Sequence, residues 1–244
     1  MNITKQSGTS SIQKISKKGI FHLCFLIGVL FSSCVRYQCI TISSSLNQNE
    51  TKEFLDETDT VRMNYSFKGE DFPITLTVFN KLKQPIYFDW KNSMVIFNGN
   101  QITDAFDHEG QVDSVAPLSS ATITSNNLSD KFVPLSKQDK ITDALIATSN
   151  GNLHIQQHVF TEETSPVLFR SVVAISTQKD LSSALLYDHP FWISSIYQTM
   201  DEALSLLSSD QFYMKKSTGF GTFMECTFGA ILLVAIAAVT PQGQ

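Results

Sequence analysis

Charged residues are scarce in this chain, and the scarcity is concentrated at its two ends. They make up 17% of the 244 residues, against about 25% in an average soluble domain. The net charge is -5, and no cluster of Lys and Arg is large enough to form a basic face. Non-specific binding to nucleic-acid phosphates requires such a face, so the sequence predicts no nucleic-acid partner.

Cysteine is also rare. The chain has four, Cys24, Cys34, Cys39 and Cys226, and none lies in residues 40–215. The middle of the chain must therefore be stabilised by core packing rather than by disulfides. No Cys-x-x-Cys pair and no Cys/His set has the spacing of a zinc site, so we expect no metal site and no cofactor.

Recognisable catalytic motifs are missing as well. There is no Gly-x-Ser-x-Gly elbow and no glycine-rich phosphate loop. His154 and His158 lie in a strand-like segment, where residues four apart share a face about 13 Å apart, too far for one metal ion. The acidic loop with Asp104, Asp107 and Glu109 lacks the order of an EF-hand. We therefore predict no catalytic or ligand-binding residue and expect the protein not to be an enzyme.

Residues 1–33 have the organisation of an export signal peptide. Four lysines precede an apolar run over residues 19–31, and no acidic residue occurs before Glu50. A run of about 13 residues has the length of a signal-peptide core and is short for a membrane span.

The end of this segment, Leu30-Phe31-Ser32-Ser33-Cys34, resembles a lipobox, the cleavage signal of bacterial lipoproteins. In that family the Cys thiol is alkylated with diacylglycerol and the Cys becomes the new amino terminus. The resemblance implies lipidation of Cys34, and acyl chains would hold the protein at a membrane. Phe31 and Ser33 replace the smaller residues of the strict pattern. Two alternatives stay open: an uncleaved N-terminal anchor helix, and cleavage without lipidation.

The middle of the chain divides into a polar stretch and a strand-rich stretch. Residues 34–59 are polar and indicate a flexible tether with a short helix around 51–57. A mainly β domain is expected over residues 60–210. Its strand-like segments are 61–67, 73–80, 86–90, 93–97, 101–106, 121–124, 131–135, 153–160, 167–175 and 191–198. Their length and spacing, with a hairpin turn at 98–100, predict an antiparallel sandwich, and short helices are expected over 180–186 and 200–207.

The stretch from Thr75 to Lys91, TLTVFNKLKQPIYFDWK, carries a more specific pattern. It resembles the strand, Asn-x-x-x-x-Pro, strand core of immunoglobulin-like domains in Bacteroidota-type envelope lipoproteins. The resemblance implies an immunoglobulin-like β-sandwich in which Phe88 or Trp90 fills the space between the sheets. It implies no activity.

The carboxyl terminus is strongly apolar. Residues 220–239 carry one charge, Glu225, and residues 227–239 carry none. As a helix, these residues would match a hydrocarbon layer roughly 30 Å thick. We predict an apolar helix over residues 217–240 that spans or contacts a membrane, and a buried C-terminal helix or strand is the alternative.

These features together predict a membrane-anchored lipoprotein of the bacterial cell envelope that faces the periplasm. Its role would be structural or interaction-based, and besides the membrane its partner would be an unknown protein or surface polymer. One alternative is an envelope hydrolase, which would need a Ser/His pair or clustered acids converging in a cleft. Another is a eukaryotic-type membrane glycoprotein anchored by its N-terminal run.

Overall fold

The computed structural model describes residues 35–106, 112–125, 128–129, 131–148, 151–199 and 207–217. Val35–Lys216 form one compact unit, here called the β unit. None of its described residues lies in an α-helix, and the described chain has no helix long and apolar enough to cross a membrane. The predicted signal peptide, the lipidation site Cys34 and the apolar C-terminal run lie outside the described residues.

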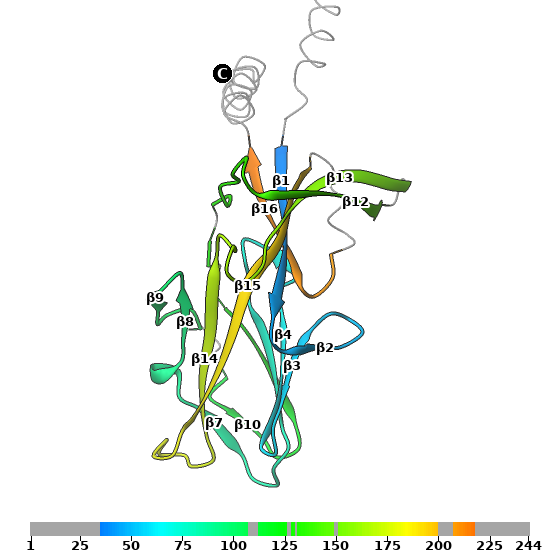
Figure 1. The fold of residues 1–244 in the computed structure, drawn as a ribbon. Coiled ribbons are helices and arrows are strands. Elements are labelled where there is room, and N and C mark those ends of the chain that lie inside the picture. Colours follow the sequence, from blue (N-terminus) through cyan, green and yellow to red (C-terminus); the bar gives the residue numbers. More distant parts are fainter. Residues whose placement is uncertain are drawn as a thin grey trace, which may run out of the picture. The chain divides into compact units, whose positions relative to one another are not determined.

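Eleven strands form the larger of two sheets (Figure 1). Its main path is β10 (Ser114–Val115), β7 (Ile86–Phe88), β14 (Leu168–Ser176), β15 (Leu185–Thr199), β1 (Val35–Ser44), β16 (Gln211–Ser217) and β5 (Gly69–Glu70). Two hairpins branch from this path: β8 (Met94–Phe97) with β9 (Asn100–Ile102), and β12 (Lys140–Thr148) with β13 (Gly151–Val159). The 15-residue strand β15 organises the sheet, because it pairs with β14, β1 and β13.

Five strands form the smaller sheet, in the order β11 (Ser120–Thr124), β6 (Thr75–Asn80), β4 (Val61–Ser66), β3 (Phe54–Glu57) and β2 (Asn47–Gln48). In β4 and β6 every second side chain is buried, as expected for a sheet with one face against a core. Threonines occupy the outer face, where Thr77 and Thr122 share a hydrogen bond of 3.0 Å. The sheets curl as a half-barrel around the shared core.

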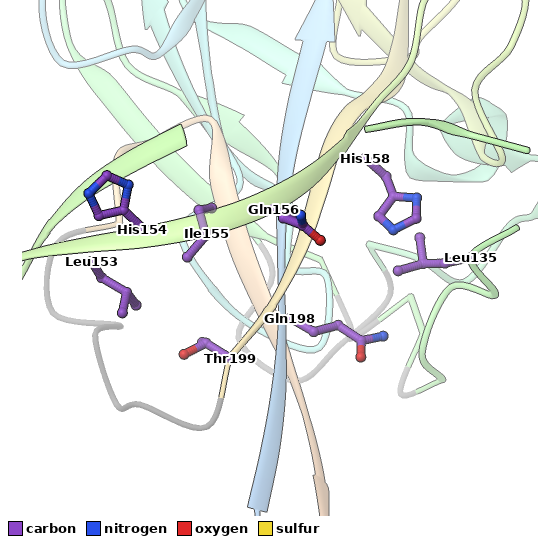
Figure 2. A pocket seen from close by; sticks show the side chains of 8 residues that line it. All are labelled: Leu135, Leu153, His154, Ile155, Gln156, His158, Gln198 and Thr199. Atoms are coloured by element: carbon purple, nitrogen blue, oxygen red, sulfur yellow. The ribbon is translucent and has the colours of Figure 1, made fainter. Parts of the chain in front are cut away.

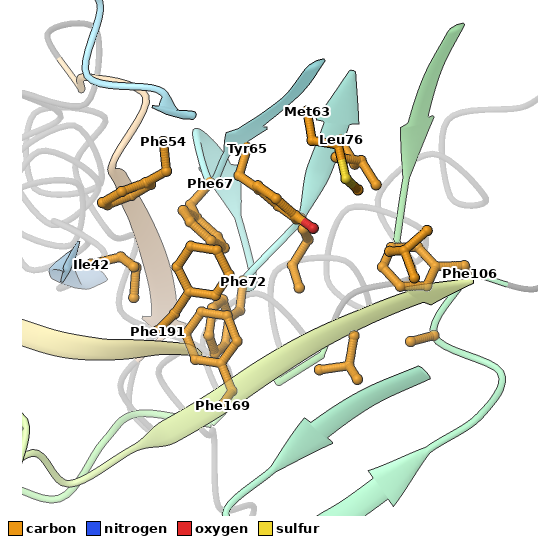
Figure 3. Packing of buried hydrophobic residues seen from close by; sticks show 14 of the residues in the cluster. Ile42, Phe54, Met63, Tyr65, Phe67, Phe72, Leu76, Phe106, Phe169 and Phe191 are labelled. Atoms are coloured by element: carbon orange, nitrogen blue, oxygen red, sulfur yellow. The ribbon is translucent and has the colours of Figure 1, made fainter. Parts of the chain in front are cut away.

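Phenylalanine dominates that core. Six fully buried rings lie at its centre, Phe54, Phe67, Phe72, Phe169, Phe191 and Phe212, most of them visible in Figure 3. Phe191 has ring centroids of four aromatic neighbours within 5.1–5.5 Å, a spacing at which aromatic pairs attract each other. Burial of each such side chain contributes roughly 1.5–3 kcal/mol, so these rings hold the two sheets together.

The polar stretch after residue 34 is not the tether that we expected. Residues 35–44 form β1, in the middle of the larger sheet, with Ile40 and Ile42 at most 1% exposed. Its other face is also covered, since Tyr37 and Cys39 are buried. The strand nevertheless contains Arg36, Gln38, Thr41 and two serines, so its sequence resembles a polar linker. The buried Gln38 is satisfied by the backbone of Val133. The short helix expected around residues 51–57 is replaced by β3.

The expected immunoglobulin-like sandwich with a helical C-terminal part is also wrong. The observed sheets form a curled half-barrel, and β16 joins the larger sheet with β5 as a parallel neighbour. Residues 180–186 form a turn and the start of β15 instead of a helix, and the chain after Leu207 turns into β16. The rest of the helix predicted over 200–207 lies outside the described residues.

The stretch that resembles immunoglobulin-like domains forms two strands that lie in different sheets. β6 ends at Asn80 in the smaller sheet, and β7 belongs to the larger one. Asn80 is fully buried. Its side-chain amide group donates to the carbonyl oxygens of Gln84, Val115 and Ala116. Its side-chain oxygen accepts a hydrogen bond from the backbone amide of Leu82. Phe88 is buried in the core as expected, and Trp90 stacks on it at 4.7 Å between centroids.

Other predictions have mixed outcomes. The hairpin turn at 98–100 is confirmed, because Asn98 and Gly99 adopt positive φ between β8 and β9. The strand predicted over 131–135 is absent; instead, the Gln38 side chain binds both the amide and the carbonyl of Val133. Strand β12 and strand β16 were not predicted.

Candidate functional site

A row of polar side chains crosses the core between the two sheets. Tyr65 on β4 and Asp56 on β3 come from the smaller sheet, and His189 on β15 comes from the larger. The Tyr65 hydroxyl lies 2.9 Å from His189 Nδ1, and His189 Nε2 lies 3.1 Å from a carboxylate oxygen of Asp56. Ser171, the cross-strand partner of His189, is fully buried beside them.

The contacts among these polar side chains favour a neutral imidazole at His189. Tyr65 donates its hydroxyl proton to Nδ1, and Nε2–H points to Asp56, so both ring nitrogens are satisfied without an extra proton. Burial lowers the pKa of His189 below its ordinary value, and the nearby Asp56 carboxylate opposes this shift without cancelling it. Burial likewise raises the pKa of Tyr65, so the phenol keeps its proton.

Ser171, His189 and Asp56 are the residue types of a hydrolytic triad, but their arrangement does not suit catalysis. A triad requires a serine hydroxyl bonded to a free imidazole nitrogen at an accessible surface. Here Tyr65 and Asp56 occupy the two imidazole nitrogens, and Ser171 is 0% exposed with no hydrogen-bond partner for its hydroxyl. These side chains instead link the two sheets through polar contacts, and their role is structural.

An open hollow of about 410 Å³ lies beside the β12–β13 hairpin (Figure 2). Its lining residues are Leu135, Leu153, His154, Ile155, Gln156, His158, Gln198 and Thr199. His158 Nδ1 lies 3.3 Å from a carboxylate oxygen of Asp139, which is close enough for an ion pair. The contact does not have the geometry of a hydrogen bond. The hollow combines imidazoles, amides and aliphatic side chains.

The structure confirms the strand that we expected around the two histidines. His154 and His158 lie on β13, on opposite sides of Gln156 in Figure 2. Across the described residues there is no group of three metal-ligating side chains. His154 is exposed on the hairpin, and His158 is half-buried.

A second hollow, of about 360 Å³, is more apolar. Phe72, Phe212 and Met214 from the edge of the core contribute to it, together with Phe132 and Val133 from the segment after β11. Lys131 also lines it, and Lys216 lies over the Phe132 ring at 5.8 Å.

Comparisons with known proteins do not indicate a class of function, because no family model, no curated protein and no solved structure matches the chain. The function must therefore be argued from the geometry.

The sequence did not predict the buried polar chain. Tyr65 and His189 are 124 residues apart, and Asp56 lay in the expected tether. The alternation of residues around His189 could have predicted its burial. Tyr187, Phe191 and Ile193 occupy every second position with His189 and are apolar or aromatic. That pattern places His189 on a buried face, where an imidazole needs hydrogen-bond partners.

Proposed function

We propose that this chain is an exported, membrane-anchored lipoprotein of the bacterial cell envelope, with a structural or interaction role. The observation that carries the proposed role is the closed arrangement of Tyr65, His189 and Asp56. These groups are used to hold the two sheets together rather than to face a substrate. The β unit then serves as a rigid body that presents a surface.

The start of the β unit supports anchoring close to the bilayer. β1 begins at Val35, so no spacer separates the predicted lipidation site Cys34 from the first strand. Acyl chains on Cys34 would therefore hold the β unit directly against the lipid headgroups, with no freedom to extend away from them.

The end of the β unit supports a second attachment to the same bilayer. β1 and β16 are neighbours in the sheet, and Figure 1 shows them running in opposite directions, so β1 begins beside the end of β16. Neighbouring strands lie about 4.8 Å apart. Two residues separate Ser217 from the apolar run over residues 220–239. Both chain ends therefore leave the β unit at the same place.

The decisive experiment is mass spectrometry of the mature amino terminus, with metabolic labelling by a fatty acid. We expect a diacylated or triacylated Cys34 as the first residue. Replacement of Cys34 by Ala removes the label and blocks cleavage, while Cys226→Ala, a matched change at a distant cysteine, leaves both unchanged. An intact Met1 or an unlabelled mature protein would overturn lipidation.

A further inference from the structure

We propose that the β12–β13 hairpin lies on the surface of an anionic lipid bilayer. The inference rests on the proposed membrane attachment and adds to it the part of the β unit that touches lipid. Position, exposed apolar side chains and local charge each support it.

The hairpin lies near the end of the β unit where both chain termini leave. Figure 1 shows β12 and β13 crossing β1 and β16 close to the start of β1 and the end of β16. The crossing is a packed contact, since Ile155 of β13 lies with Cys39 and Tyr197 in a small apolar cluster. β13 also pairs with β15 over Gln157–Val159. If β1 and β16 point toward the bilayer, a hairpin of this length lies along it for about 30 Å.

One face of the hairpin covers the sheet and the other exposes large apolar side chains. Ala144 and Ile146 are partly buried against the small apolar cluster. On the opposite face, Ile141 is 48% exposed and Leu145 is 61% exposed. Both lie on β12 four residues apart, so they project from the same side of the strand. Asp143, which is exposed, lies between them on this side of the strand. A bilayer interface accepts apolar side chains at shallow depth with charged groups beside them.

The charge at this end differs from that of the whole chain. Six exposed basic side chains surround the hairpin and the two chain ends: Arg36, Lys131, Lys137, Lys140, Lys215 and Lys216. Among the described residues of these segments and of the neighbouring β5 turn, the acids are four: Glu70, Asp71, Asp139 and Asp143. The local balance is therefore +2 (six minus four), against -5 for the chain. Each Lys or Arg near an anionic leaflet contributes about 1 kcal/mol of attraction.

The chain offers a matched control at the far end of the same sheet. Leu186 is 64% exposed, much like Leu145, but it lies at the start of β15, whereas the hairpin contacts the other end of that strand. A change at either leucine leaves the core untouched, so both variants are expected to fold.

The test uses the full-length protein in vesicles of phosphatidylglycerol and phosphatidylcholine, with lipids brominated near the headgroup end of their acyl chains. Leu145→Trp and Leu186→Trp are each compared with the parent, whose own tryptophans supply the background. We expect the bromines to quench most of the fluorescence added at position 145 and none of that added at 186. Vesicles without phosphatidylglycerol should quench the added fluorescence at 145 less.

Flotation of the same vesicles separates the two proposals. Protein that does not float with lipid overturns the membrane attachment, and the hairpin contact with it. Protein that floats but is quenched equally little at both positions overturns the hairpin contact alone. Emission at 145 that is blue-shifted without quenching shows a protein partner or a second copy over the hairpin, which also overturns the contact with lipid.

Discussion

The interior between the two sheets and the β12–β13 hairpin differ in how they treat apolar side chains. In the interior, aromatic rings are buried on all sides, and Tyr65, His189 and Asn80 among them have hydrogen-bond partners within the fold. In the hairpin, one face packs on a few residues and the other exposes Ile141 and Leu145. We infer that the interior determines the stability of the fold and that the hairpin determines the properties of this part of the surface. A substitution in one region should therefore leave the property of the other unchanged.

The largest expected effect is the loss of an interior ring. Phe191→Ala removes a side chain that contacts Phe54, Tyr65, Phe67 and Phe169, and the cavity should cost about 3–5 kcal/mol of unfolding free energy. Urea unfolding followed by tryptophan fluorescence measures the change. Loss of less than about 1 kcal/mol would show that the aromatic cluster can collapse around the gap.

Asn80 tests whether the polar contacts of the interior matter as much as its rings. Asn80→Ala leaves three carbonyls, of which that of Val115 is buried, and one amide without their side-chain partner, and we expect a loss of about 3 kcal/mol. Asn64, half-buried on β4 of the same sheet, is the control, because Asn64→Ala removes a single side-chain contact with Glu53. Equal losses at the two positions would contradict the role of Asn80 in joining β6 to β7.

A smaller effect should depend on pH. The pKa of His189 is lowered in the folded state, so below about pH 6.5 the unfolded chain takes up a proton that the folded chain resists. Stability should therefore fall as the pH drops from 6.5 toward the lowered pKa, by at most about 1.4 kcal/mol per pH unit. His189→Gln should lower stability at pH 7.5 but remove this part of the pH dependence.

The control for the pH experiment is His154→Gln, at an exposed position on the hairpin. Urea midpoints at pH 7.5 and 5.5 are compared for the parent and both variants. A pH dependence that persists unchanged in His189→Gln would show that the buried polar chain does not titrate as inferred.

The smallest effect on stability is expected in the hairpin. Leu145→Ser changes an exposed side chain and should alter the unfolding free energy by no more than about 0.5 kcal/mol. Hydrogen exchange of the β12 amides should be faster than that of the β15 amides, because few buried contacts hold the hairpin. A large loss of stability in Leu145→Ser would mean that the two regions are not separate after all.

The outcome of the sequence predictions follows from the number of faces that each strand buries. β4 and β6 bury one face and alternate strictly, and both were predicted at nearly their observed positions. β1 is buried on both faces but carries polar residues, among them the buried Gln38, and its sequence was interpreted as a linker because the partner of Gln38, Val133, is distant in the sequence. The Asp56, Tyr65 and His189 contacts could not be predicted, because they join residues far apart in the sequence and on different sheets.

The sequence alone determined that the middle of the chain is β-structured, that a hairpin turn lies at residues 98–100 and that no disulfide stabilises residues 40–215. These properties depend on local periodicity, turn chemistry and composition, which neighbouring residues carry. Tertiary structure alone decided that β1 and β16 lie side by side, that a buried imidazole joins the two sheets and that a half-exposed hairpin lies near both chain ends. Such relations depend on which distant strands pair, and pairing is selected by the burial of the whole core rather than by any one segment.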